Sequence, residues 1–141
     1  MEETKTERIK ALLLAVPSDH FEKLEKVLKQ LGIKSSRASG VAEANQVLSR
    51  TDVPWLVFTD TELPDGNWET VLKLAAKTAA PPRVIVVSRV VDLKLYIETL
   101  TQGADDFIVP PFLLDDVAWV VQGAILHASA PVYHAKHAAV A

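Results

Sequence analysis

The sequence predicts an α/β fold, a doubly wound parallel sheet in which five strands alternate with five helices. Two observations predict it. Short apolar runs of strand length recur along the chain, and segments with the spacing of amphipathic helices separate them. The runs are apolar almost throughout rather than at alternate positions, which is typical of parallel strands covered by helices on both faces.

The predicted strands are short apolar runs that end at turn-forming residues such as Pro, Gly, Ser and Asp. The second strand is polar and weak, so we expect it at an edge of the sheet, whereas the third is expected at the centre. In chain order, the predicted strands are residues 9–16, 33–39, 54–60, 83–88 and 106–109.

Each predicted helix presents one apolar stripe to the sheet. Asp19 and Glu22 have the spacing of a capping box at the start of the first helix. Gly32 and Gly103 end the first and fourth helices. The fourth helix is predicted to turn Leu93, Tyr96, Ile97 and Leu100 inward, and the fifth Leu113, Val117, Val120, Val121 and Ala124. The helices themselves are predicted over residues 19–31, 41–49, 68–76, 93–100 and 113–124.

The bulk composition limits the class of protein. A chain of 141 residues suits one domain, which we place at residues 1–129, with a tail at 130–141 that is either disordered or an extension of the last helix. The net charge of −3 argues against a nucleic-acid binder. The sequence has no cysteine, no signal-peptide core and no apolar run long enough to span a membrane, so we expect a cytoplasmic protein.

Asp60 is the first candidate for a functional residue. It ends the predicted central strand and directly precedes a turn at residues 61–66. Open α/β sheets place their chemistry at the carboxyl ends of their strands, so a carboxylate there indicates a site. An aspartate that only hydrogen-bonds the turn is an equally open interpretation of this segment alone.

Three segments together resemble the receiver domain of bacterial response regulators, over roughly residues 8–128. Asp60, with Pro64 four residues later, is similar to the family's phosphoacceptor segment. Residues 84–88 are similar to its fourth strand, which ends in Ser or Thr, here Ser88. Gly103 to Phe112 is similar to its Gly-Ala-x-Asp-Tyr-hydrophobic-x-Lys-Pro-Phe segment. The resemblance implies a flavodoxin-like (βα)5 sandwich with strand order 2-1-3-4-5, with a cis bond between Pro110 and Pro111.

The resemblance also implies roles for individual residues. Asp60 would accept a phosphoryl group from a histidine kinase, and Ser88 would donate a hydrogen bond to it. Phe107 would be the aromatic residue that swings inward on activation. The backbone carbonyl of Glu62, together with the Asp60 carboxylate, would be a magnesium ligand.

The chain departs from the family at two points that matter for this chemistry. Ala15 and Val16 occupy the positions of the family's two acidic magnesium ligands, and Pro110 occupies that of its lysine. Phosphoryl transfer depends on neutralising charge on the phosphoryl oxygens, and Mg²⁺ is usually held by one or two carboxylates. We therefore expect a weak or absent Mg²⁺ site. Arg89 or His20 could replace the lysine, or both could be ordinary exposed side chains.

Other residues give weaker signals. In the resembling family, the fourth and fifth helices form an output and dimer surface, and Leu95, Trp119 and Leu126 fall opposite the predicted inward stripes of these helices. We expect these three residues to contribute to a partner or homodimer interface, although scattered exposed apolar residues are also normal. His127, His134 and His137 match no compact metal motif, so we expect no metal there.

Three functions remain to be compared. The first is a signalling receiver phosphorylated on Asp60, and the second is a degenerate receiver that works as a phosphorylation-independent interaction module. The third, a small α/β enzyme or nucleotide binder, is disfavoured because residues 15–18 contain no glycine for a phosphate loop. We expect no enzymatic activity and no nucleic-acid or membrane partner. No DNA-binding segment follows residue 128, so output is expected through contacts with a histidine kinase or another signalling protein.

Overall fold

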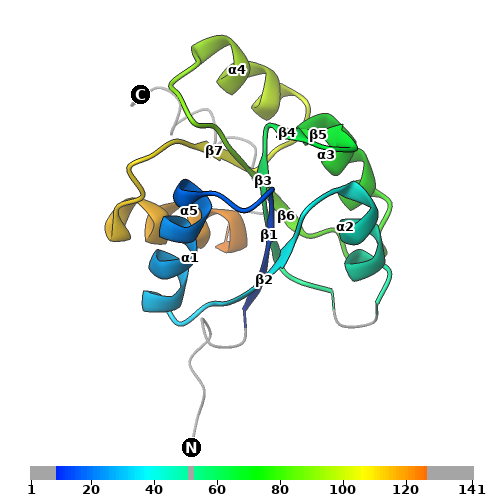
Figure 1. Cartoon of the computed structure of the whole chain (residues 1–141), viewed down its shortest axis with the longest axis horizontal. Coiled ribbons are helices and arrows are strands. Elements are labelled where there is room, and N and C mark those ends of the chain that lie inside the picture. Colours follow the sequence, from blue (N-terminus) through cyan, green and yellow to red (C-terminus); the bar gives the residue numbers. More distant parts are fainter. Residues whose placement is uncertain (1–8, 51–52, 127–141) are drawn as a thin grey trace, which may run out of the picture.

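A five-stranded parallel sheet forms the middle layer of the protein (Figure 1). The computed structural model describes residues 9–50 and 53–126, and the predicted tail at 130–141 lies outside these residues. The sheet order is β2-β1-β3-β6-β7, which confirms the predicted order 2-1-3-4-5 and the edge position of the polar second strand. The strands are β1 (Lys10–Leu14), β2 (Lys34–Ala38), β3 (Leu56–Asp60), β6 (Arg83–Val87) and β7 (Asp106–Ile108).

Helices cover both faces of the sheet, as the apolar strands require. α1 (Asp19–Gln30) and α5 (Leu114–Leu126) lie together on one face (Figure 1). The other face carries α2 (Val41–Leu48), α3 (Trp68–Ala76) and α4 (Leu93–Thr101). This arrangement confirms the predicted α/β class.

Side chains along the central strand β3 alternate between the two faces. Leu56 and Phe58 pack in the core under α1 and α5, whereas Val57 packs in the core under α2 and α3. Asp60 follows Phe58 by two residues, so its side chain belongs to the α1 and α5 side. The sequence of β3 therefore directs the carboxylate toward the beginning of α1.

A short antiparallel hairpin that the sequence analysis did not predict follows β3. It consists of β4 (Glu62–Leu63) and β5 (Gly66–Asn67). The turn between them carries Asp65, whose carboxylate accepts the backbone N–H groups of Val41 at 2.7 Å and Ala42 at 3.0 Å. These bonds lower the pKa of Asp65 and cap α2. A Cβ at Gly40 would lie 2.6 Å from the Asp65 Oδ1, so the close approach requires glycine there.

The predicted end signals of two helices are confirmed, whereas the predicted capping box at the start of α1 is not. Gly32 and Gly103 have φ angles of 79° and 108° and end α1 and α4, as predicted. The Asp19 capping box was wrong, because Ser18 is the extended N-cap residue and makes no side-chain cap bond, which leaves Asp19 inside the first turn. A capping box instead opens α3, between Asn67 and Thr70.

The inward face predicted for α4 was partly wrong. Tyr96 and Leu100 are half-buried, but Leu93 and Ile97 are 68% and 54% exposed. Leu95, predicted to face outward, packs against the cluster of Trp68, Val86 and Ala104. The helix carries two overlapping apolar stripes, and its short sequence does not fix which one meets the sheet. Leu113, predicted to face inward from the fifth helix, is also exposed, because it precedes the first residue of α5.

Candidate functional site

Asp60 lies at the carboxyl edge of the sheet, where strand pairing sets it beside Val87 of β6. Its side chain is buried. The Asp60 Oδ1 accepts the backbone N–H of Thr61 at 2.8 Å, and Oδ2 forms an ion pair with the Arg89 Nη2 at 3.4 Å. The Arg89 side chain is 62% exposed, so solvent screens this pair and the guanidinium is free to adjust its position. The structure thus pairs the candidate acceptor with a cation.

The residues around Asp60 do not fit a magnesium site. Ala15 follows the end of β1, and Val16 beyond it is exposed. Among residues 9–50 and 53–126, no group of three or more acidic or histidine side chains could hold a metal ion. An ion here would have a single carboxylate ligand, Asp60, which already contacts Arg89 and Thr61. The role of the Glu62 backbone carbonyl as a magnesium ligand remains a prediction. A neutral carbonyl would not supply the negative charge that the missing carboxylates would have provided.

Ser88 comes directly after β6 and is buried at the same edge as Asp60. Its hydroxyl donates to the Val90 carbonyl at 2.8 Å and accepts the Val90 N–H at 3.3 Å, so it closes its own turn. Phe107 is half-buried, packs edge-on against Tyr96 and belongs to the cluster on the opposite side of the sheet from Phe58. The roles of both residues in phosphoryl chemistry therefore stay predictions.

His20 and Arg89, the two suggested substitutes for the missing lysine, both lie close to Asp60. Burial lowers the pKa of His20 and the nearby Arg89 lowers it further, while the Asp60 and Asp19 carboxylates oppose the shift. The His20 ring packs edge-on against Phe21 at 4.9 Å, and its Nε2 is buried without a hydrogen-bond partner. His20 is thus a partly buried imidazole that favours its neutral form. The Pro110–Pro111 peptide bond nearby is cis, as the resemblance implied.

A hollow of about 830 Å³ adjoins this site, and we call it the carboxyl-edge hollow. The sequence analysis missed two of its residues, Lys23 and Lys26, because lysines on the outer face of a helix give no distinct signal. It is lined by Ser18, Asp19, His20, Lys23, Lys26, Val27, Arg89, Pro110, Pro111 and Phe112. The segments that meet here lie far apart in the sequence, and the sheet topology brings them together.

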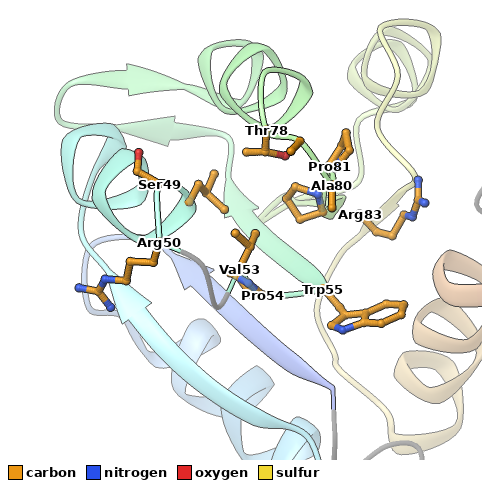
Figure 2. A pocket seen from close by; sticks show the side chains of 12 residues that line it. Ser49, Arg50, Val53, Pro54, Trp55, Thr78, Ala80, Pro81 and Arg83 are labelled. Carbon is orange, nitrogen blue, oxygen red and sulfur yellow. The ribbon is translucent and has the colours of Figure 1, made fainter.

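A second hollow, of about 640 Å³, lies at the opposite edge of the sheet, and we call it the amino-edge hollow. Figure 2 shows Val53 and Pro54 in its middle, with the guanidinium groups of Arg50 and Arg83 pointing away from each other on either side. No acidic residue or histidine is among its lining residues, which are Leu48, Ser49, Arg50, Val53, Pro54, Trp55, Thr78, Ala79, Ala80, Pro81, Pro82 and Arg83. It therefore does not bring the candidate site residues together.

The three candidate interface residues fall into two groups. Trp119 is 53% exposed and Leu126 is also exposed, both on α5, as predicted. Leu95 is half-buried on α4 and contributes to the core instead. The interface role of all three stays a prediction. His127, His134 and His137 lie outside the described residues.

Comparison with known proteins agrees with the fold. No protein-family model matches the chain. Response regulator protein PilR of Pseudomonas aeruginosa is 30% identical over 104 residues, which cover 74% of this chain and 23% of PilR. The chain therefore spans about a quarter of the length of this relative.

Solved receiver domains match over nearly their whole length. A response regulator receiver protein from Pseudomonas putida has 25% identity and a TM-score of 0.67, covering 82% of this chain and 96% of that one. A receiver domain from Clostridium thermocellum has 20% identity and a TM-score of 0.72, covering 85% and 96%. The fold and the edge carboxylate define a receiver-type domain. The chain has the fold of a response-regulator receiver domain, and it is similar in sequence to the response regulator PilR.

Proposed function

We propose that this receiver domain acts in two-component signalling as a phosphorylation-independent interaction module. The observation that carries the proposal is the Asp60–Arg89 ion pair. A cation already pairs with the candidate acceptor, and Ala15, just after the neighbouring strand, stands in place of an acidic ligand. Receiver domains are generally non-enzymatic signalling modules, and we propose no enzymatic activity for this one.

A phosphorylated receiver is the second candidate, and two observations favour it. Asp60 ends β3 and Ser88 follows the paired strand β6 at the same edge, which is the arrangement that the resemblance implies. The Arg89 side chain is 62% exposed and lies beside Asp60, so its guanidinium is placed to pair with phosphoryl oxygens as the family's lysine would. In this version Arg89 would change partners from the carboxylate to the phosphoryl group.

Treatment with acetyl phosphate, with and without Mg²⁺, separates the two candidates. The interaction-module proposal expects no gain of a phosphoryl group in the intact mass under either condition. It also expects no Mg²⁺-dependent amide shifts at Asp60, Ser88 or Phe107 with beryllofluoride. A phosphoryl adduct that disappears in Asp60→Asn would overturn this proposal in favour of the second candidate.

The partner is proposed to be a histidine kinase or another signalling protein, with Trp119 and Leu126 on α5 supporting partner or homodimer contacts. Trp119→Asp is expected to reduce the solution mass of a dimer, or to abolish partner capture. Trp55→Asp is a matched control, because Trp55 is 57% exposed but lies at the amino edge. Equal behaviour of the two variants would remove Trp119 from the interface. Within the described residues, no helix is long and apolar enough to cross a membrane, and the cytoplasmic location stays a prediction.

A further inference from the structure

Two buried polar atoms point to a ligand in the carboxyl-edge hollow. Among residues 9–50 and 53–126, Ser18 Oγ and His20 Nε2 are the buried side-chain polar atoms without a hydrogen-bond partner. Both residues line this hollow. Leaving a buried polar atom unpaired costs about 1–3 kcal/mol, and proteins rarely tolerate it without a functional or structural reason. A ligand bound in the hollow would supply the missing partners once a shift at the start of α1 exposes these two atoms.

The charge of the hollow selects an anion. Lys23, Lys26 and Arg89 contribute three cationic groups, and Asp19 is the single carboxylate among the lining residues. Neither Lys23 nor Lys26 forms an ion pair with any residue of the described ranges. The whole chain has a net charge of −3, so this local excess of positive charge runs against the overall balance. A cleft lined by one sign of charge attracts ligands of the opposite sign.

The other side of the hollow is apolar. Val27 of α1 and Phe112 after β7 are half-buried, and both pack at the margin of the core under α1 and α5. Pro110 and Pro111 extend this wall. The volume of about 830 Å³ falls within the range of small-molecule sites, roughly 300–1,000 Å³. The hollow therefore suits a molecule with an anionic group at one end and an apolar body at the other.

We propose that the carboxyl-edge hollow binds a small organic anion. Lys23, Lys26 and Arg89 hold its phosphate, sulfonate or carboxylate group, and Val27 and Phe112 contact its apolar body. Because Arg89 also pairs with Asp60, an occupied hollow would change the partners of the candidate acceptor. The inference goes beyond the proposed function, since it needs neither a phosphoryl group on Asp60 nor Mg²⁺.

Three probes test the proposed chemistry, each titrated into protein freed of metal ions and chelator and followed by backbone amide NMR. Phenyl phosphate carries both features, inorganic phosphate only the anion, and benzyl alcohol only the apolar body. Phenyl phosphate is expected to saturate with an affinity roughly tenfold or more above either control, with shifts at residues of the hollow. Equal affinities for all three probes would overturn the proposal, as would shifts centred on Arg50 and Arg83 at the amino edge.

Variants of α1 test the assigned residues. The double variant Lys23→Gln/Lys26→Gln is expected to weaken phenyl phosphate binding by roughly tenfold or more, because it removes two of the three cations. Lys29→Gln is the matched control on the same helix, outside the hollow, and is expected to bind within about twofold of the parent chain. Exposed lysines can be replaced with little loss of stability, so a change in binding affinity would not result from unfolding. An unchanged affinity in the double variant would overturn the proposal.

The proposed ligand site and the phosphorylation-independent function are tested by different outcomes, so either can be wrong without the other. Asp60→Asn removes the candidate acceptor but leaves the lining residues in place, so it is expected to retain phenyl phosphate binding. A phosphoryl adduct on Asp60 would contradict the phosphorylation-independent function without affecting this ligand site. Loss of phenyl phosphate binding in Asp60→Asn would instead show that the anion needs the acceptor carboxylate and would overturn the separate site.

Discussion

The two hollows at opposite edges of the sheet differ in how their polar groups are satisfied. In the amino-edge hollow, the hydroxyls of Ser49 and Thr78 donate to helix carbonyls at 2.7 and 2.9 Å (Figure 2). In the carboxyl-edge hollow, Ser18 and His20 each bury a polar atom that has no such partner. The two volumes are comparable, so size does not distinguish a packing defect from a binding site. The difference lies in whether the buried polar atoms have hydrogen-bond partners.

The same strand anchors both edges. The backbone N–H of Trp55 donates to the Lys10 carbonyl, and the Trp55 carbonyl accepts the Arg83 N–H, so the amino edge is tied to the neighbouring strands. Five residues later, Asp60 presents its side chain to Arg89. The backbone fixes one end of β3, whereas a charged side-chain contact completes the other. A change in the middle of β3 should therefore disturb both edges, while a change at either end should stay local.

Phe58→Ala gives the largest expected effect. Phe58 is fully buried in the middle of β3, and removing a buried aromatic ring costs about 3–5 kcal/mol of unfolding free energy. Trp55→Ala, at the exposed end of the same strand, is expected to cost less than about 0.5 kcal/mol. Urea denaturation of both variants measures the difference. Comparable losses in the two would mean that the exposed edge, and not the core, holds β3 in place.

The next effect compares two helix starts. Asn67→Ala removes a side chain that accepts the N–H groups of Glu69 and Thr70, so it is expected to cost about 0.5–2 kcal/mol. Ser18→Ala removes a hydroxyl that makes no cap bond, so it is expected to be nearly neutral. Thermal unfolding of both variants provides the test. If Ser18→Ala lowers the unfolding free energy as much as Asn67→Ala does, then the Ser18 hydroxyl caps α1 in solution and is not an unpaired group available to a ligand.

The sequence predicted those features that depend on burial along single segments. Each strand of the five-stranded sheet lies within its predicted bounds, because a short apolar run is buried as a strand. Asp60 lies at the predicted edge because it ends such a run. The face of α4 was not predictable in the same way. Leu93 and Ile97 compete with Leu95 for the interior, and the choice depends on the cluster of Trp68, Val86 and Ala104 that Leu95 packs against.

Contacts between segments far apart in the chain could not be predicted from the sequence. Asp65 caps α2 from 23 or more residues away, a contact that no local capping pattern can reveal. The carboxyl-edge hollow likewise combines the start of α1 with Arg89 and the Pro110–Pro111 bond. Arg89 itself was recognised as a candidate because it follows Ser88. Its ion pair with Asp60 could not be predicted from the sequence, because it depends on the pairing of β3 with β6.

The smallest expected effect is a pH dependence that belongs to the carboxyl edge alone. Burial and Arg89 lower the pKa of His20 below its ordinary value of 6.5, so the unfolded chain binds this proton more readily than the folded one. Stability is therefore complete above about pH 6.5 and falls as the pH drops through the lowered value. Unfolding free energies of the parent chain and His20→Gln, measured from about pH 8 to about pH 5, should change in parallel above about pH 6.5 and diverge as the pH falls below it. Parallel curves throughout would mean that His20 titrates equally in both states, and the carboxyl edge would then be as well satisfied as the amino edge.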